Sequence, residues 1–201
     1  MARAGTYPVH SALATAAEGV LPDPLDHFAE EHLRQREVCG MLDTIAAAAR
    51  PDRAVTIEAL RHLTTALPRH LHDEEQGLFP SLRHRSEPDD EINDTLDRLD
   101  ADHAKTAQFL DAVIAALGRI AGSGGALTAE EAETVTGFAA HERRHLIVEN
   151  AIVLPLARVR LTAGDLDALR QAMVLRRAPD TNTDSTGDRD ANWDGDGDGD
   201  G

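Results

Sequence analysis

Residues 70–80 read HLHDEEQGLFP, and residues 145–155 read HLIVENAIVLP. Both stretches begin with a His, have a Glu four residues later and a Pro six residues after that Glu, and lie 75 positions apart. A His and a Glu four residues apart occupy the same face of a helix, one turn from each other. Each stretch therefore predicts a helix that directs an imidazole and a carboxylate toward one point.

A lone His precedes each stretch, and the order H, HxxxE, H, HxxxE indicates a duplicated two-helix unit. In an up-and-down bundle, residues on consecutive antiparallel helices lie at the same height when they are equidistant from the connecting turn. The midpoints between the four positions fall at 52, between 87 and 88, and at 125, each within a turn sequence rich in Pro, Asp or Gly. We therefore expect six side chains to meet at one level of one bundle: His32, His70, Glu74, His103, His145 and Glu149.

Length and composition bound the class of protein. The 201 residues suffice for one domain and a tail, and the formal net charge of −16 excludes a basic nucleic-acid footprint and argues against anionic membrane surfaces. No run approaches the roughly 18 consecutive apolar residues of a membrane span. A single cysteine, Cys39, and the lack of a signal segment predict a cytoplasmic protein, and we expect a monomer or a homodimer.

Apolar residues recur at helical spacing, and no segment alternates with period two, so the sequence predicts an all-α fold: an up-and-down four-helix bundle with a short fifth helix. The expected helices span about 24–49, 54–83, 89–121, 128–160 and 162–177. Pro68 predicts a bend in the second helix, and Thr128-x-x-Glu131 predicts a capping box that opens the fourth. The inward stripe of the fourth helix is predicted to be Val135, Phe138, His145, Glu149, Ile152 and Leu156.

Three regions follow from this pattern. Residues 1–22 lack periodicity and predict a flexible N-terminal arm, and residues 23–178 form the predicted bundle domain. Residues 179–201 are mostly Asp, Gly, Thr and Asn, a composition with too little apolar surface to order itself. We therefore predict a disordered acidic tail.

The six polar residues on apolar helix faces predict a metal site. A buried carboxylate without a partner costs several kcal/mol, so two Glu among four His need a cation. Six side chains are too many for tetrahedral zinc, whereas two octahedral ions need about twelve positions. Four His and two bridging Glu leave roughly four positions for an oxo or hydroxo bridge and an external ligand, which suits a di-iron centre.

These residues resemble the hemerythrin-like family, specifically its bacterial HHE branch, across about residues 23–160. The resemblance implies that His32, His70, Glu74, His103, His145 and Glu149 bind two iron ions and that the two Glu bridge them. It also implies a protein that binds O2, peroxide or nitric oxide in a sensing, scavenging or iron-handling role.

The chain departs from the classical oxygen carriers of that family at one ligand. Those proteins take a fifth His from an HxxxH pair on the third helix and use an Asp on the fourth, whereas this chain has Leu99 and Ala107 on either side of His103. His141, one turn before His145, is a candidate to fill that position from the fourth helix. The alternative is an exposed or supporting His.

Three other functions stay open at this point. A di-iron oxidase, oxygenase or peroxidase would need a cavity beside the metals for a small organic substrate. A zinc peptidase would use His141-Glu142-Arg143-Arg144-His145 as an HExxH motif with Glu142 as general base, although this leaves the other four ligand candidates unexplained. A metal-free interaction module would make the ligand pattern a coincidence.

Overall fold

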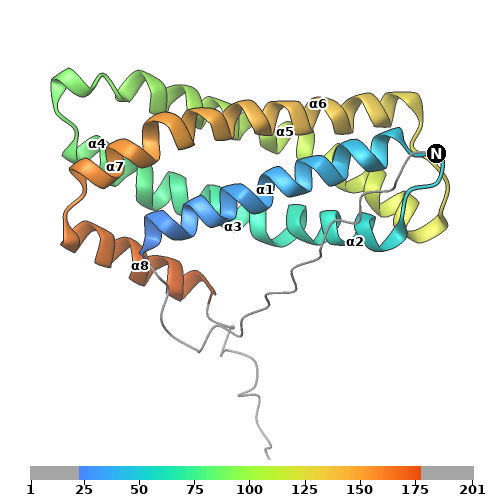
Figure 1. Ribbon diagram of the computed structural model, residues 1–201, viewed down its shortest axis with the longest axis horizontal. Coiled ribbons are helices and arrows are strands. Elements are labelled where there is room, and N and C mark those ends of the chain that lie inside the picture. Colours follow the sequence, from blue (N-terminus) through green and yellow to red (C-terminus); the bar gives the residue numbers. More distant parts are fainter. Residues whose placement is uncertain (1–22, 178–201) are drawn as a thin grey trace, which may run out of the picture.

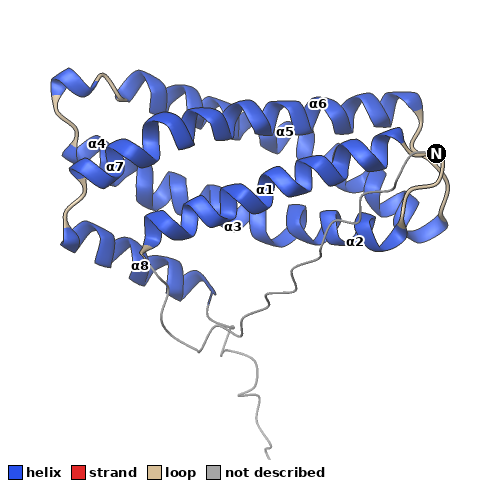
Figure 2. Cartoon of the chain, viewed as in Figure 1, coloured by secondary structure: helices blue, strands red, loops and turns tan. Residues whose placement is uncertain are grey.

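The computed structural model describes residues 23–177, and within that range the chain is helical without strands (Figures 1 and 2). Four long helical rods lie roughly side by side, with a shorter helix packed against them, so the predicted bundle with a fifth helix is confirmed. The elements are α1 (Pro24–Ala47), α2 (Arg53–Arg61), η1 (His62–Ala66), α3 (Leu67–Asp73), η2 (Glu74–Leu78), α4 (Phe79–Arg85), η3 (Pro88–Asp90), α5 (Asn93–Ser123), α6 (Ala129–Val148), η4 (Glu149–Val153), α7 (Leu154–Arg160) and α8 (Ala163–Arg177).

Two of the four rods contain π-helical turns. The second rod runs without a break from α2 through η1, α3 and η2 to α4, and the fourth runs from α6 through η4 to α7. Each π-helix begins six residues before a proline, and the residue before that proline donates its N–H to the carbonyl five residues back. Because proline lacks an N–H and its ring crowds the carbonyl four residues back, a wider turn removes the conflict. The helix thus continues through Pro68 by widening.

The π-helix in the fourth rod overturns one part of the predicted inward stripe. Ile152 was expected to face the core but is 44% exposed, whereas Val153 is fully buried and Leu154 nearly so. A π turn inserts one extra residue, which shifts the phase of every residue that follows it on the helix. The stripe therefore moves by one position after Glu149.

The helix ends follow capping chemistry. Asp23 accepts a hydrogen bond from the Leu25 N–H at 2.8 Å and opens α1, and Thr128 and Glu131 form the predicted capping box of α6. The third rod begins later than expected, at Asn93 instead of about 89, because Pro88–Asp90 form a 3-10 turn and Glu91 has a positive φ of 48°. Such a conformation cannot extend a helix.

The apolar core is divided into two clusters along the bundle. One cluster joins the start of α1, α4, the start of α5, α7 and α8. The other joins the later part of α1, α2, the later part of α5 and the first half of α6. The level that carries the predicted metal ligands lies between them, so apolar packing on both sides fixes the height of the four rods around it.

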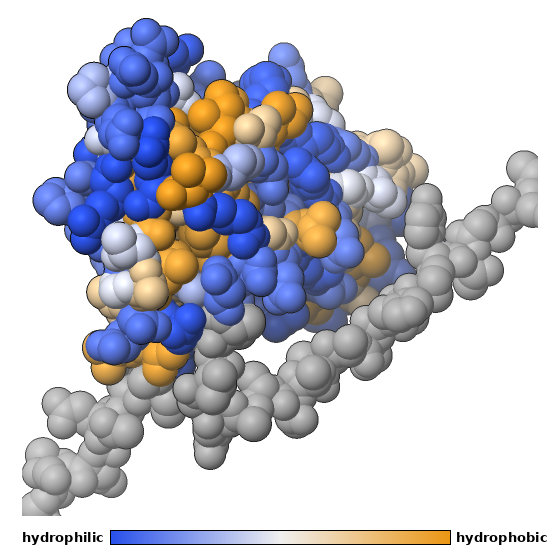
Figure 3. All heavy atoms as spheres, turned by 60° about the vertical axis from the view of Figure 1, so that its left-hand side comes forward, coloured by the Kyte–Doolittle hydropathy of each residue, from blue (hydrophilic) through white to orange (hydrophobic). Residues whose placement is uncertain are grey.

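The surface of the described residues is mixed. Figure 3 shows apolar residues interspersed among hydrophilic ones on the face that comes forward there, and the large apolar side chains that are exposed are Leu33, Ile57, Ile147, Ile152, Val159 and Leu175. Among residues 23–177, no helix has the length and apolar character needed to cross a membrane. The predicted arm and acidic tail lie outside the described residues.

Candidate metal centre

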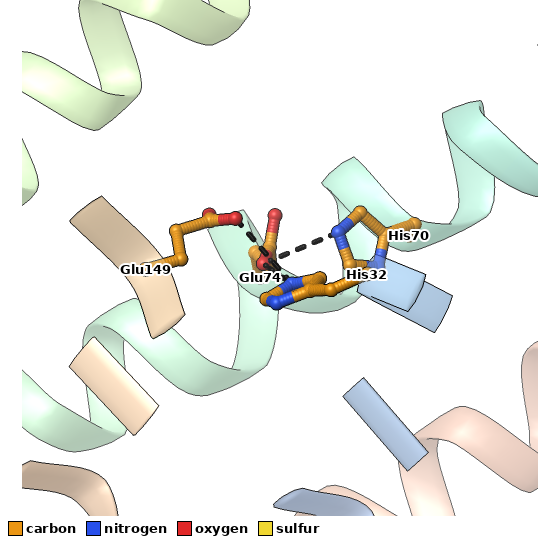
Figure 4. Close-up of side chains that lie close together, drawn as sticks. All are labelled: His32, His70, Glu74 and Glu149. Carbon is orange, nitrogen blue, oxygen red and sulfur yellow. Dashed lines mark ion pairs between the residues drawn. The ribbon is translucent and has the colours of Figure 1, made fainter. Parts of the chain in front are cut away.

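Six buried side chains from all four rods meet at one level of the bundle. They form two overlapping groups, each with ligand atoms within 4.8 Å of one another. The first group, labelled in Figure 4, consists of His32, His70, Glu74 and Glu149. The second group consists of Glu74, His103, His145 and Glu149, so the two groups share both Glu. None of the six is more than 3% exposed. The convergence expected from the sequence spacing is therefore present in the fold.

The Glu74 carboxylate lies between the two His pairs. Its Oε1 is 3.5 Å from Nε2 of His32 and 3.4 Å from Nε2 of His70, whereas its Oε2 is 3.5 Å from Nε2 of His103. The two oxygens of one side chain therefore face different imidazole pairs.

Glu149 repeats this arrangement from the opposite rod. Its Oε2 is 3.4 Å from Nε2 of His32, and its Oε1 is 2.9 Å from Nε2 of His145. The imidazole rings of each pair are also close, with centroids 5.0 Å apart for His32 and His70 and 4.7 Å apart for His103 and His145. Each pair of His thus faces one oxygen from each Glu.

Most polar atoms at the centre lack hydrogen bonds, and the exceptions are Nε2 of His103 and Nε2 of His145, which lie 3.0 Å apart. Within the described residues, all four carboxylate oxygens of Glu74 and Glu149 are buried without a hydrogen-bond partner, as are Nε2 of His32 and His70. A buried polar atom left unpaired costs about 1–3 kcal/mol, and more when it is charged. A group of nitrogen and oxygen atoms that converge in this way without satisfying one another fits a cation between them.

The pKa shifts of Glu74, His32 and His103 agree with this fit, whereas the Glu149 charge raises the pKa of His145. Burial raises the pKa of Glu74 well above its usual value, and the nearby Glu149 charge raises it further. Burial lowers the pKa of His32 to about 4, and burial together with His145 lowers the pKa of His103. The neutral imidazole is the form that binds metal, and a cation would relieve the repulsion between the two carboxylates.

An outer layer of carboxylates lies beside the other ring nitrogens of three His and forms hydrogen bonds with two of them. Glu31 Oε2 is 3.1 Å from Nδ1 of His70, and Glu75 Oε1 is 3.0 Å from Nδ1 of His103. An Asp102 oxygen lies 3.9 Å from Nδ1 of His145, beyond hydrogen-bond distance, and within the described residues this nitrogen has no hydrogen-bond partner. Hydrogen bonds such as those of Glu31 and Glu75 orient a ligating imidazole and select its tautomer.

This outer layer was not predicted from the sequence, although the chain carries a signal for it. An acidic residue directly precedes each lone His, as Glu31 and Asp102, and a polar residue directly follows each Glu of the HxxxE pairs, as Glu75 and Asn150. The duplication thus extends one residue beyond the ligands. Asn150 differs from the other three because it is not acidic, and its amide donates to the Leu146 carbonyl at 2.6 Å.

The structure does not bring His141 into either group. It is buried, and its Nε2 lies 3.2 Å from the carbonyl oxygen of Asp102 on α5. The neighbouring Glu142 is also buried, and its two oxygens accept hydrogen bonds from Gln35 at 2.5 Å and Thr106 at 2.6 Å. The two His of the HExxH motif therefore do not share a metal group in this fold, and Glu142 is engaged elsewhere.

Comparison with known proteins identifies the family. A family model described as the hemerythrin HHE cation-binding domain matches residues 23–157. The match spans more than half of the chain and includes all six converging side chains, so the chain belongs to this family. A search of curated proteins found no match.

Proposed function

We propose that the protein binds two iron ions in a non-haem di-iron centre. The ligands would be His32 and His70 for one ion and His103 and His145 for the other. Glu74 and Glu149 would serve both. Nitrogen-rich ligation with two carboxylates suits iron, whereas magnesium and calcium prefer oxygen-rich sites.

The observation that carries this proposal is the orientation of the two carboxylates. Glu74 and Glu149 each direct one oxygen toward each His pair. A carboxylate that bound a single ion would not need its second oxygen beside the other His pair. A two-ion centre uses all four oxygens and all four imidazoles, whereas a single tetrahedral ion would leave several of them buried and unpaired.

We further propose that the centre binds O2, peroxide or nitric oxide for sensing, scavenging or iron handling. When bound, the iron pair supplies a redox-active site for such small ligands. The protein's own residues shield the centre from water and orient the ligands: the Phe28 ring packs against His70 with centroids 5.7 Å apart, and the Phe79 ring stacks on His103 at 5.6 Å. Apolar rings around a metal site limit solvent access.

A pocket that reaches one of the six converging side chains has room for a small ligand. Among the described residues, a pocket of about 60 Å³ reaches His70 between α1 and the second rod, lined by Glu31, Arg34, Gln35, His62, Ala66 and His70. Pockets for organic substrates are typically about 300–1,000 Å³. A diatomic gas or peroxide suits this space, whereas the alternative of a di-iron oxidase, oxygenase or peroxidase acting on an organic substrate would need it to enlarge.

Metal analysis combined with optical spectroscopy tests the proposal. The protein should contain two irons per chain, and the reduced protein should change its visible spectrum on exposure to air, peroxide or nitric oxide. Zinc at one per chain, or iron at one per chain, would contradict the di-iron centre. Catalytic turnover of an added organic reductant with O2 would instead favour the enzyme.

A further inference from the structure

The C-terminal helix α8 packs beside the candidate metal centre. It contacts α1, α3 and η2, the elements that carry His32, His70 and Glu74, and Figure 1 shows it along their lower side. Met173 is fully buried and Leu169 nearly so. The approach is close, since a Cβ added at Gly77 would lie 2.5 Å from Cδ1 of Leu169. This helix lies beyond the residues that the family model matches.

Two arginines at the end of α8 bind a buried carboxylate next to the centre. Asp73, which directly precedes Glu74, is fully buried. It pairs with the guanidinium of Arg176 and, at 2.7 Å, with Nη1 of Arg177. A buried carboxylate left without its cation would be strongly destabilised, so Asp73 requires α8 in place.

Arg177 also reaches the outer layer of the centre. Its Nη2 lies 3.1 Å from Oε1 of Glu31, to which His27 also approaches at 3.1 Å. The other oxygen of Glu31 faces Nδ1 of His70 at 3.1 Å. A continuous series of polar contacts thus runs from Arg177 through Glu31 to a candidate ligand.

The other half of the centre lacks this support. The side chains of Glu75 and Asp102, which face His103 and His145, are 39% and 43% exposed, against 23% for Glu31. In the described part of the chain, neither forms an ion pair with an arginine or lysine. The two halves of the duplicated unit therefore differ in how their outer carboxylates are held.

We propose that Arg177 is a positioning residue for the metal centre, acting through Glu31 to fix the ring orientation of His70. The proposal rests on the di-iron function above. The arginine holds Glu31 in the geometry in which it accepts the Nδ1–H of His70, so that Nε2 stays directed at the centre. Loss of a group that orients a metal ligand typically costs about 10–100-fold in metal affinity.

The test compares Arg177→Met with Arg170→Met. Arg170 lies on the same helix but pairs with Asp167 on the surface. In Arg177→Met, transfer of iron to a chelator should be at least about tenfold faster than in the parent, and one of the two iron environments seen by Mössbauer spectroscopy should change. The Arg170→Met variant should match the parent in both measurements.

A double variant distinguishes positioning from loosened packing of α8. If Arg177 acts through Glu31, then Glu31→Gln and Arg177→Met together should release iron no faster than the stronger single variant. Leu169→Ala, which weakens packing without touching these charges, should lower the melting temperature and leave both Mössbauer signals unchanged. Unaltered release and spectra in a folded Arg177→Met protein would overturn the inference. A parent that binds no iron would instead overturn the proposed function.

Discussion

Glu74 and Glu149 each occupy the first position of a five-residue π-helix, and each is followed six residues later by a proline. The carbonyl of each Glu accepts the N–H of the residue before the proline. π-helical turns are rare and frequently lie at functional sites. His62 stands in the same relation to Pro68 but joins neither ligand group. The proline therefore explains the π turn, and the side chain at its first position determines whether that turn serves the metal.

Because both carboxylates lie between the two His pairs, we expect the removal of either one to release iron from both halves of the centre. Glu74→Ala and Glu149→Ala should each lose most of the iron from both halves, because one oxygen of each side chain faces each His pair. Metal analysis after identical purification provides the measurement. His72→Ala is the matched control, since His72 is exposed on the same helix. Retention of one full iron in either Glu variant would show that this Glu serves a single ion.

The phase shift after Glu149 predicts opposite effects at two neighbouring positions. Val153→Ala should destabilise the protein by roughly 1–3 kcal/mol, because it removes buried methyl groups from the core. Ile152→Ala should change stability by no more than about 0.5 kcal/mol, as is usual for surface substitutions. Urea unfolding of both variants measures the difference. A larger loss at Ile152 would mean that the fourth rod is a regular α-helix there.

The arrangement of the rods was predictable because periodicity and turn residues determine it. The positions of His32, His70, His103 and His145 relative to three turns predicted that they share one level, and they do. The register within a rod was less predictable. A π turn adds one residue without changing the composition of the segment, so the error at Ile152 arose from assuming one period along the whole helix.

The outer carboxylates of the site were also not predictable from the sequence. Glu31 and Glu75 were not singled out from the sequence, because acidic residues are common in a chain with 36 of them. Their roles depend on contacts between different rods, which spacing along one helix cannot reveal. The contact of Arg177 with Glu31 is harder still to predict, since 146 residues separate them.

A partly buried His outside the ligand groups predicts a dependence of stability on pH. Burial, with the nearby Arg34 charge, lowers the pKa of His62 from 6.5 to about 4. The unfolded chain therefore binds a proton at His62 below about pH 6.5, whereas the folded chain does so only below about pH 4. Between these values the unfolded state gains protons that the folded state lacks, and stability falls as the pH falls.

The variant His62→Leu should remove this contribution. The free energy of unfolding of the metal-free parent should decline more steeply than that of the variant from pH 6.5 to pH 4, as measured by urea titration at several pH values. Using metal-free protein for both chains keeps the titration of the metal ligands common to the two curves. Curves that stay parallel over this range would contradict a neutral His62 in the folded state.

The variant His141→Ala distinguishes three hypotheses about this residue: a supporting His, a fifth iron ligand and a zinc ligand of an HExxH motif. Its Nε2 contacts the Asp102 carbonyl and it belongs to neither ligand group, so His141→Ala should retain two irons and leave the visible spectrum and the azide-binding rate unchanged. The melting temperature should fall, because a buried ring and its hydrogen bond are lost, at a cost of roughly 1–3 kcal/mol.

Each competing reading makes a different prediction for that variant. A fifth His ligand would leave an open coordination position after the change, altering the spectrum and speeding the reaction with azide or peroxide. An HExxH zinc site would lose its metal, and Glu142→Gln would abolish peptide cleavage while the metal stayed bound. In this fold Gln35 and Thr106 already donate to both oxygens of Glu142. We therefore expect Glu142→Gln to lower stability, since its new amide would face those two donors, and to leave the iron content at the level of the parent.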